Sequence, residues 1–318
     1  MTTLRAAIVQ AYTPRDLADG LATCASKVAH ATAEGATLVV FPETWLPGYP
    51  IWLDVCRDVA LWNHAPVKAV YRQLAEESVA VPGDATRSLA DIARTHRITL
   101  VIGVSERVDD GPGRGTLYNT ILTFGPDGSL LNHHRKLMPT YTERMVWGAG
   151  DADGIRSVTV DDARVGALVC WEHWMPLARQ ALHEAGEDVH VALWPTVHEM
   201  HQVASRQYAF EGRCFVLAAG SLMRAADLPA GLEAHSSKVS SDEQFVLRGG
   251  SAIIAPDGAY LAGPIFEEEA VLVATLDLAR VREESMTLDV TGHYHRPELL
   301  SLHVQRGGRT VTRIPDAP

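Results

Sequence analysis

The sequence predicts an α/β fold in which helices cover β-sheets. Short runs of apolar and β-branched residues alternate along the chain with segments whose apolar residues recur at helical spacing. This alternation is typical of layered α/β proteins. Two Pro-Asp-Gly turns, at residues 126–128 and 256–258, each join two strand-like runs. These similar hairpins indicate that the fold has two similar halves.

The first half is expected to begin with a strand over 4–10 and a helix over 16–34, which ends at Gly35 because glycine readily forms a C-cap. A strand over 37–41 is halted by Pro42, and a stretch rich in Pro, Gly and Trp extends to about residue 66. The remaining elements of this half are helices over about 67–78 and 84–97 and strands over 98–106, 117–124 and 130–135.

The second half repeats the alternation of strands and helices. A polar, Ser-rich segment over 224–244 is expected to be a surface loop, and no break in composition separates the two halves. We therefore predict one domain over 1–303 and a flexible C-terminal tail over 304–318. The expected strands are 164–170, 189–194, 214–220, about 250–255 and about 271–276, and the expected helices are about 176–185, 200–211 and 277–285.

The composition is that of a soluble globular protein, with 47% hydrophobic and 21% charged residues. A net charge of −11 without a basic run argues against nucleic-acid binding. No apolar stretch approaches the roughly 20 residues of a membrane span, and the N-terminal residues lack the pattern of a signal peptide. The four cysteines are widely spaced, which favours reduced thiols in a cytoplasmic protein over a disulfide framework.

Three ionisable residues follow predicted strands: Glu43, Lys136 and Cys170. If these strands end on the same side of one sheet, the carboxylate, the ammonium and the thiol meet there. A free thiol has a pKa of about 8.5 and attacks weakly until it is deprotonated. Glu43 can accept its proton, and Lys136 can stabilise the thiolate. Each residue also has an ordinary interpretation, as a packed cysteine, a surface glutamate and a solvated lysine.

Three segments, in this order along the chain, resemble the signature segments of the nitrilase superfamily. They are Phe41-Pro42-Glu43 with Pro47-Gly48-Tyr49-Pro50, then His134-Arg135-Lys136-Leu137-Met138-Pro139-Thr140, then Cys170-Trp171-Glu172-His173. The residues of these segments resemble those of the true nitrilase branch most closely. Similar matches at 211–217, 249–254 and 292–297 extend the resemblance from about residue 4 to residue 300.

The resemblance implies a four-layer α-β-β-α sandwich. It also implies Glu43 as general base, Lys136 as cationic stabiliser and Cys170 as nucleophile. Glu143 stands where the family has a second glutamate, although it could instead form a surface salt bridge with Arg144. Glu172, next to Cys170, is expected to point the other way, into a structural network.

Aromatic residues and histidines near these motifs are candidates for the walls of a small-molecule pocket. We expect no cofactor and no metal, because the two histidines of His198-Glu199-Met200-His201 are three positions apart, not four as in HExxH. His173 is expected to shape the site without transferring protons. The predicted substrate-binding residues are Trp52, Tyr141, Trp171, His173, Trp194 and His198.

The resemblance predicts a nitrilase that converts an organic nitrile and water into a carboxylic acid and ammonia. The reaction is expected to pass through a thioimidate and a thioester on Cys170, with some amide as by-product. An aliphatic amidase or carbamoylase, or a cyanide-converting enzyme, with the same three residues is the alternative. A non-catalytic assembly protein is a further alternative that the intact set of three residues disfavours. We also expect a homodimer or a larger homo-oligomer, a spiral included.

Overall fold

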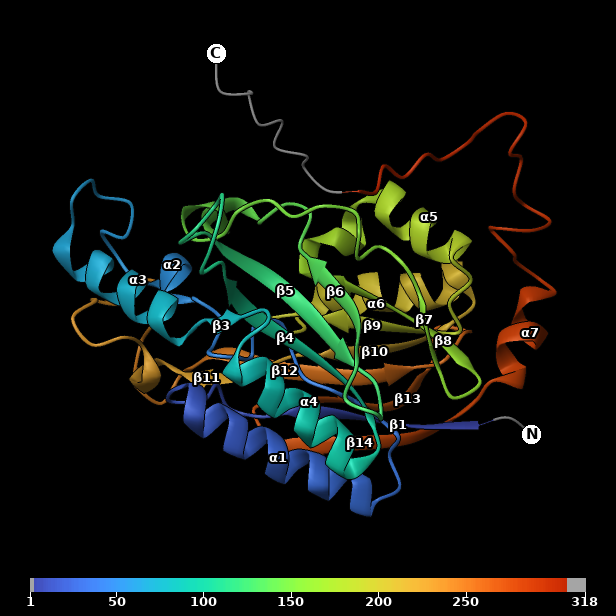
Figure 1. Ribbon diagram of the computed structural model, residues 1–318, viewed down its shortest axis with the longest axis horizontal. Helices are drawn as coiled ribbons and strands as arrows, with labels where there is room; N and C mark the ends of the chain where they lie inside the picture. Colours follow the sequence, from blue (N-terminus) through green and yellow to red (C-terminus); the bar gives the residue numbers. More distant parts are fainter. Residues whose placement is uncertain (1–2, 308–318) are drawn as a thin grey trace, which may run out of the picture.

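The computed structural model of the protein describes residues 3–307. They form two seven-stranded β-sheets, with helices outside both (Figure 1). Apolar side chains from both sheets share one buried core between them. The predicted α-β-β-α sandwich is confirmed.

The first sheet has the spatial order β14-β1-β2-β4-β5-β6, and the short β3 pairs with β4. Strands β1, β2 and β4 run parallel to one another, whereas β14, β5 and β6 are each antiparallel to their neighbours. The bounds are β1 (Thr3–Gln10), β2 (Leu38–Val40), β3 (Val79–Ala80), β4 (Thr99–Arg107), β5 (Leu117–Phe124), β6 (Leu130–Arg135) and β14 (Ala270–Asp277).

The second sheet has the spatial order β11-β12-β10-β9-β8-β7, and β13 pairs with β12. Its strands β8, β9 and β10 are parallel, and the others are antiparallel to their neighbours. The bounds are β7 (Val158–Val160), β8 (Ala163–Val169), β9 (Val189–Leu193), β10 (Phe215–Ala219), β11 (Leu222–Arg224), β12 (Phe245–Ile254) and β13 (Tyr260–Phe266).

The helices cover the outer faces of the two sheets. α1 and α4 lie side by side against the first sheet, and α5 and α6 lie on the second (Figure 1). The helices are α1 (Leu17–Ala33), α2 (Trp52–Val55), α3 (Ala65–Glu77), α4 (Asp84–His96), α5 (Pro176–Glu184), α6 (Glu199–Gly212) and α7 (Ala279–Ser285). Short 3₁₀ helices are η1 (Tyr141–Met145), η2 (Cys170–Trp174) and η3 (Ala225–Asp227).

The two halves repeat one arrangement, as the similar turns predicted. In each half, three parallel strands joined by helices are followed by an antiparallel hairpin. The first Pro-Asp-Gly turn joins β5 to β6, and the second joins β12 to β13. The second half also contributes a strand to the first sheet, because β14, from the end of the second half, pairs along the whole of β1.

The residues of β1 show why this strand is apolar at almost every position. Successive side chains of a strand point to opposite faces. Ala6 and Ile8 belong to the core shared with the second sheet, whereas Ala7 and Val9 pack in the core beneath α1 and α4. A strand buried on both faces has a continuous apolar run instead of an alternating one.

Several short elements were not predicted. α2 lies within the stretch that the sequence left without structure, and β3, β7 and β11 have only two or three residues each. Of the predicted tail, 304–307 contacts the body, where the Arg306 guanidinium donates to the carbonyl of Ile155 at 2.7 Å. The rest of that tail, 308–318, lies outside the described residues.

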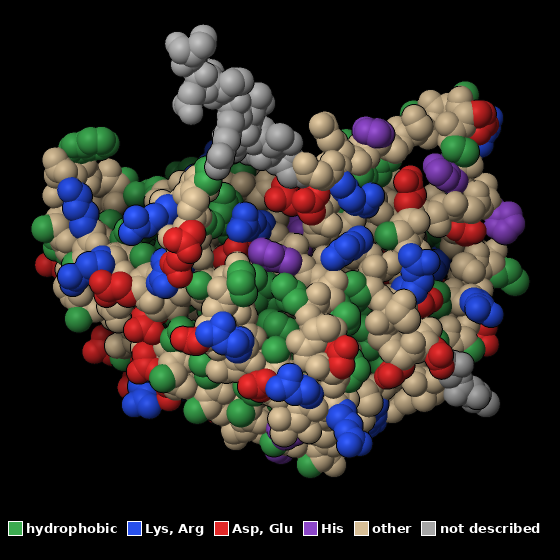
Figure 2. Space-filling view, in the orientation of Figure 1, with side chains coloured by type: hydrophobic (Ala, Val, Ile, Leu, Met, Phe, Trp, Pro, Cys, Tyr) green, Lys and Arg blue, Asp and Glu red, His purple; other side chains and the backbone are tan. Residues whose placement is uncertain are grey.

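The surface carries charges of both signs. On the face shown in Figure 2, Lys and Arg side chains are interspersed with Asp and Glu, and they do not gather into one basic stripe. Among the helices described within 3–307, none has the length and apolar character needed to cross a bilayer.

Candidate active site

Glu43 is placed by a sharp turn after β2. Its backbone N–H reaches the carbonyl of Trp194, at the end of β9 in the second sheet, at 3.4 Å. Gly103 of β4 makes this turn sterically feasible, because a Cβ atom at that position would lie 2.3 Å from the carbonyl oxygen of Pro42. The turn therefore directs the Glu43 side chain into the space between the sheets, where it is fully buried.

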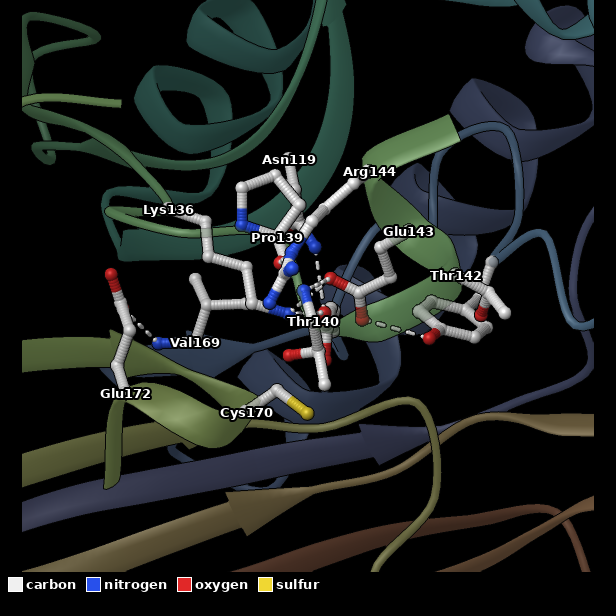
Figure 3. A network of polar contacts seen from close by, with 12 residues as sticks. Asn119, Lys136, Pro139, Thr140, Thr142, Glu143, Arg144, Val169, Cys170 and Glu172 are labelled. Atoms are coloured by element: carbon white, nitrogen blue, oxygen red, sulfur yellow. Dashed lines mark hydrogen bonds and ion pairs between the residues drawn. The ribbon is translucent and has the colours of Figure 1, made fainter. Parts of the chain in front are cut away.

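Lys136 follows the last residue of β6, and its ammonium joins two carboxylates. Its backbone N–H donates to the carbonyl of Asn119 at 2.7 Å, which fixes the backbone beside β5. The Nζ atom donates to Oε1 of Glu43 at 3.1 Å and to Oε2 of Glu143 at 2.7 Å (Figure 3). All three side chains are buried, so the two ion pairs are shielded from solvent.

Cys170 follows β8 and opens η2. Its φ of 49° places a residue with a side chain in the left-handed region, which costs roughly 1–2 kcal/mol. The turn directs the sulfur toward the cluster of Glu43, Lys136 and Glu143 (Figure 3).

The prediction that these residues meet at the edge of one sheet is wrong. Glu43 and Lys136 follow strands of the first sheet, whereas Cys170 follows a strand of the second. The site is therefore built between two facing sheets. Single-sheet topology could not place the thiol there, because the contact depends on how the sheets pack.

Glu143 belongs to the cluster and does not form a surface salt bridge with Arg144. Its Oε2 accepts the backbone N–H of Thr140 at 2.8 Å, which caps the start of η1. Its Oε1 accepts the hydroxyl of Tyr49 at 2.8 Å. Arg144 instead donates to the carbonyl of Pro139 at 3.1 Å.

Two further polar residues contact the cluster and were not among the predicted site residues. Asn119 of β5 donates its amide to Oε1 of Glu43 at 2.6 Å. Tyr49 donates to Glu143, and burial together with the nearby carboxylates raises the pKa of its hydroxyl, so that it remains a donor. Asn119 stands within the predicted strand 117–124, where asparagine is disfavoured, and that was a usable signal.

Burial and neighbouring charges set the protonation of the site. Burial raises the pKa of Glu43 to about 7, with Glu143 adding to the rise and Lys136 opposing it. Burial and the charge of Glu43 also raise the pKa of the Cys170 thiol well above its usual range. Burial disfavours the Lys136 cation, but Glu43 and its other anionic neighbours outweigh this effect and raise its pKa. The resting cluster thus holds a protonated thiol beside a carboxyl poised to exchange a proton near neutrality.

One oxygen of Glu43 is free to act on another molecule. Its Oε1 accepts from both Asn119 and Lys136, whereas its Oε2 is buried with no hydrogen-bond partner among the described residues. A buried carboxylate oxygen without a partner is costly unless a reactant or water completes it. The arrangement can therefore accept a proton at a defined atom.

The side chains of Glu43, Glu143 and Cys170 are also of the types that bind metal ions. Ligand atoms of Glu43, Glu143 and Cys170 lie within 4.8 Å of one another. However, the ammonium of Lys136 already bonds to both carboxylates and supplies the positive charge that a metal ion would bring. The donor set fits an ammonium-bridged catalytic cluster better than a metal centre.

Glu172 points away from the cluster, as expected from the sequence. It accepts the backbone N–H of Val169 at 2.7 Å (Figure 3). It also accepts the backbone N–H of Leu137 at 2.7 Å and contacts the ring of His134. Burial acts to raise the pKa of Glu172, but His134 and these donors outweigh it and lower the pKa. Glu172 thereby ties the chain after β6 to the end of β8.

The predicted aromatic wall is only partly assembled. Trp52 is buried and lines a hollow of about 420 Å³ together with Tyr49, whose hydroxyl contacts the cluster. Trp171 is 53% exposed and Tyr141 is 80% exposed. Trp194 is fully buried, and its ring stacks on that of His173.

The structure does not bring His198 to the cluster. It lies in a different hollow, whose lining includes Arg206, Arg248 and Tyr260 but none of Glu43, Lys136 and Cys170. His198 directly precedes α6, and its neighbours in that hollow come from α6, β12 and β13. Proximity to Trp194 in sequence was therefore a poor guide to proximity in space.

A family model described as carbon-nitrogen hydrolase matches residues 5–284. The chain belongs to the carbon-nitrogen hydrolase family. This hydrolase is 39% identical over 291 residues to a nitrilase of Paraburkholderia phymatum, which covers 88% of this chain and 80% of the relative. It is also 39% identical over 308 residues to a bifunctional nitrilase/nitrile hydratase of Lupinus angustifolius. That alignment covers 95% of this chain and 86% of the relative. These relatives support the nitrilase branch of the family.

The fold of this hydrolase matches a solved structure of low sequence identity. A carbon-nitrogen hydrolase from Helicobacter pylori G27 superimposes with a TM-score of 0.73 at 17% identity, covering 93% of this chain and 97% of the other. At that identity the likeness concerns the fold alone.

Proposed function

We propose that this enzyme hydrolyses an organic nitrile to a carboxylic acid and ammonia, with Cys170 as nucleophile, Glu43 as general base and Lys136 as electrostatic stabiliser. The observation that carries the proposal is the buried Lys136 ammonium, which bonds to Glu43 and Glu143 beside the thiol. Glu143 shares the charge of Lys136 and keeps the ammonium in place. The nitrilase names of the relatives supply the substrate class.

The first step forms a covalent intermediate. The Cys170 sulfur attacks the nitrile carbon as its proton passes to Glu43, and Glu43 then transfers that proton to the nitrile nitrogen. The product is a thioimidate with a carbon–sulfur bond and one fewer carbon–nitrogen π bond. Because the pKa of Glu43 is raised to about 7, it can accept and return a proton near neutral pH.

The second step exchanges nitrogen for oxygen. Glu43 deprotonates a water molecule, which adds to the thioimidate carbon and gives a tetrahedral intermediate. When the nitrogen is protonated it leaves as ammonia, and a thioester remains on Cys170. A second water, activated in the same way, releases the acid and restores the thiol. Lys136 and the backbone N–H of Trp171 stabilise the negative charge that develops near the sulfur.

The tetrahedral intermediate can also collapse in a second way. If the sulfur leaves before the nitrogen, the product is an amide, with one water consumed in place of two. The bifunctional nitrilase/nitrile hydratase name of the lupin relative supports an amide by-product for this chain as well.

Substrate contacts are proposed for residues that surround the cluster. Trp52, Trp171 and Tyr141 offer apolar faces to a substrate. His173 stacks on Trp194 and contacts the backbone carbonyl of Cys170, so this pair shapes the site beside the nucleophile. His198 is left out because it lines another hollow.

The test is the release of ammonia from a panel of compounds. The panel contains an arylacetonitrile, an aromatic nitrile, an aliphatic dinitrile, cyanide and a primary amide. We expect ammonia from at least one organic nitrile, complete loss in folded Cys170→Ala, and retained activity in the control Cys56→Ala, whose thiol is also buried but outside the cluster. Ammonia from the amide alone would assign an amidase, and ammonia from cyanide alone would assign a cyanide-converting enzyme.

The enzyme is proposed to form a homodimer or a larger homo-oligomer. Apolar side chains are exposed on the two helices outside the second sheet, among them Leu177 of α5 and Met200, Val203 and Phe210 of α6. Large exposed apolar patches commonly mark protein interfaces. Light scattering coupled to size exclusion measures the assembly, and a monomer at micromolar concentration would contradict the proposal.

A cytoplasmic location is proposed from the thiols. All four cysteines are free and buried in the structure, as expected where proteins are kept reduced. Fractionation of the native host followed by immunodetection tests this location.

A further inference from the structure

A chain of hydrogen bonds runs through the second sheet to the backbone of Cys170. Glu187 contacts Nδ1 of His190 through Oε2 at 2.9 Å. Nε2 of His190 lies 3.0 Å from Nε2 of His173, and Nδ1 of His173 lies 2.7 Å from the carbonyl oxygen of Cys170. All of these side chains are buried. The chemical steps proposed above do not use Glu187 or His190.

The number of donors that these hydrogen bonds require determines how many protons the two imidazole rings hold. The Glu187 carboxylate and the Cys170 carbonyl, which end this series of hydrogen bonds, can only accept hydrogen bonds. Three hydrogen bonds then need three ring protons on His173 and His190, whereas two neutral imidazoles carry only two. The pair therefore holds one extra proton, whose positive charge is balanced by Glu187. Burial raises the pKa of Glu187, but His190 and His183 outweigh it and lower the pKa to about 2, so the carboxylate is ionised.

The extra proton belongs to His190. This ring contacts the Glu187 carboxylate directly, whereas burial and the neighbouring His190 lower the pKa of His173 well below its usual value. His173 is thus neutral, with its proton on Nδ1, and it donates to Cys170. Its Nε2 accepts from His190.

Other groups contact the two ends of this chain of hydrogen bonds. The hydroxyl of Tyr208 donates to the second oxygen of Glu187, and His183 lies 3.5 Å from that oxygen. Arg179 donates to the backbone carbonyl of His173 at 3.0 Å and pairs with Glu211 at 2.9 Å. His201 stacks on Trp194, behind the ring of His173. The hydrogen bond from Arg179 and the stacking on Trp194 leave His173 little freedom to turn.

The bond to Cys170 controls the direction of a second group. A peptide unit is planar, and in the trans form its C=O and N–H point in opposite directions. By holding the carbonyl of Cys170, His173 therefore also directs the N–H of Trp171, which stabilises the Cys170 thiolate. The φ of 49° at Cys170 is a strained conformation that requires such support.

We propose that Glu187, His190 and His173 are positioning residues, a buried relay with one positive charge that fixes the Cys170–Trp171 peptide plane and so directs a backbone N–H at the nucleophile. The relay deepens the proposed function, on which its role in nitrile turnover rests. Its effect on the thiol itself can be measured without any nitrile.

The experiment compares His190→Leu with the matched control Tyr208→Phe. Both residues are buried and contact Glu187, but Tyr208 lies outside the chain of bonds to Cys170. The readouts are the rate at which iodoacetamide alkylates Cys170, identified by mass spectrometry, and kcat and KM for a nitrile. For His190→Leu we expect alkylation and kcat to fall about tenfold or more, with KM changed less than about threefold. For Tyr208→Phe both rates should stay within about twofold of the wild type.

Glu187→Gln tests the charge separately from the geometry. The amide nitrogen of Gln can donate to Nδ1 of His190, and its oxygen can still accept from Tyr208, so two neutral rings complete the chain. We expect near wild-type alkylation. In ¹⁵N spectra of the wild type, we expect signals of a doubly protonated imidazole that are lost in His190→Leu, and this loss assigns them to His190. The same signals should be absent from Glu187→Gln. If His190→Leu does not fold, His173→Phe keeps the stacking on Trp194, lacks the donor and should give the same slow alkylation.

The outcomes separate the relay from the proposed function. Wild-type alkylation in folded His190→Leu or His173→Phe, or two neutral rings in the wild-type spectrum, overturns the relay. If the wild type hydrolyses no nitrile but His190→Leu still slows alkylation, the relay stands and the proposed substrate is wrong.

Discussion

The ammonium of Lys136 donates to Oε2 of Glu143 across 2.7 Å, with both side chains buried between the two sheets. A buried cation is costly unless anions compensate it, and here the second anion is Glu43. The charge of Glu143 therefore does two things. It retains the ammonium, and it raises the pKa of Glu43.

Glu143→Gln should separate these effects. With one negative charge removed, the pKa of Glu43 falls, so the acid limb of the kcat/KM profile moves to lower pH. The weaker base and the displaced ammonium should lower kcat by about tenfold to a hundredfold. Arg144→Gln is the control, because Arg144 is exposed and does not contact Glu143. Equal losses in both variants would contradict a role inside the cluster.

The pH profile should report the raised pKa of Glu43. Because the base must be ionised to accept a proton, kcat/KM should rise with pH through about 7 and fall tenfold per unit below it. The Asn119 amide stabilises the ionised form, so Asn119→Ala should move this limb to higher pH. Asn132→Ala removes a buried amide that donates to Gly154, outside the cluster, and should leave the limb in place.

Gly103→Ala should affect activity through the backbone. The added methyl group would lie 2.3 Å from the Pro42 carbonyl and 2.7 Å from the Cα of Glu43. We expect a loss of about 1–3 kcal/mol in the free energy of unfolding and a fall in kcat in the protein that still folds. At the control Gly125→Ala, the added methyl meets only side-chain atoms, at 3.1 Å or more. Urea denaturation and turnover assays measure both effects, and unchanged kcat in Gly103→Ala would show that the turn tolerates displacement.

His183 should make stability depend on pH. Burial alone lowers its pKa, but Glu187 and Glu211 outweigh this and raise it from 6.5 to about 8. The stabilisation is therefore fully present below pH 6.5 and is lost as pH rises through 8, by about 2 kcal/mol. Denaturation at pH 6 and pH 9 should show this fall in the wild type and a smaller one in His183→Gln. An equal fall in both proteins would assign the pH dependence to other groups.

The parts of the fold that depend on local sequence were predicted well. Pro-Asp-Gly turns have a physical cause at the level of a few residues, and the matching hairpins of the two halves follow from them. The helix over 16–34 was placed correctly as α1, because Asp16 caps it and Gly35 follows it. The short strand β7 was missed, because three residues carry too little periodicity to be distinguished from a loop.

The parts of the site that depend on packing between sheets were predicted less well. The family resemblance identified Glu43, Lys136, Cys170 and Glu143, which do lie together. It did not identify Asn119, whose role depends on β5 lying beside the turn of Glu43. The link between His190 and His173 was also invisible, because it joins a strand to a 3₁₀ helix across 17 positions.

The pairing of β14 with β1 has a consequence for how the protein is made on the ribosome. β14 pairs with β1 along its full length, yet it is synthesised after all the residues of the cluster. Until residues 270–277 emerge, the N-terminal strand has an open edge, and an open edge pairs readily with other chains. Nascent chains therefore keep this edge open to mispairing until late in translation. A chain that stops short of β14 should aggregate or be degraded, and it should not persist as a partly active fragment.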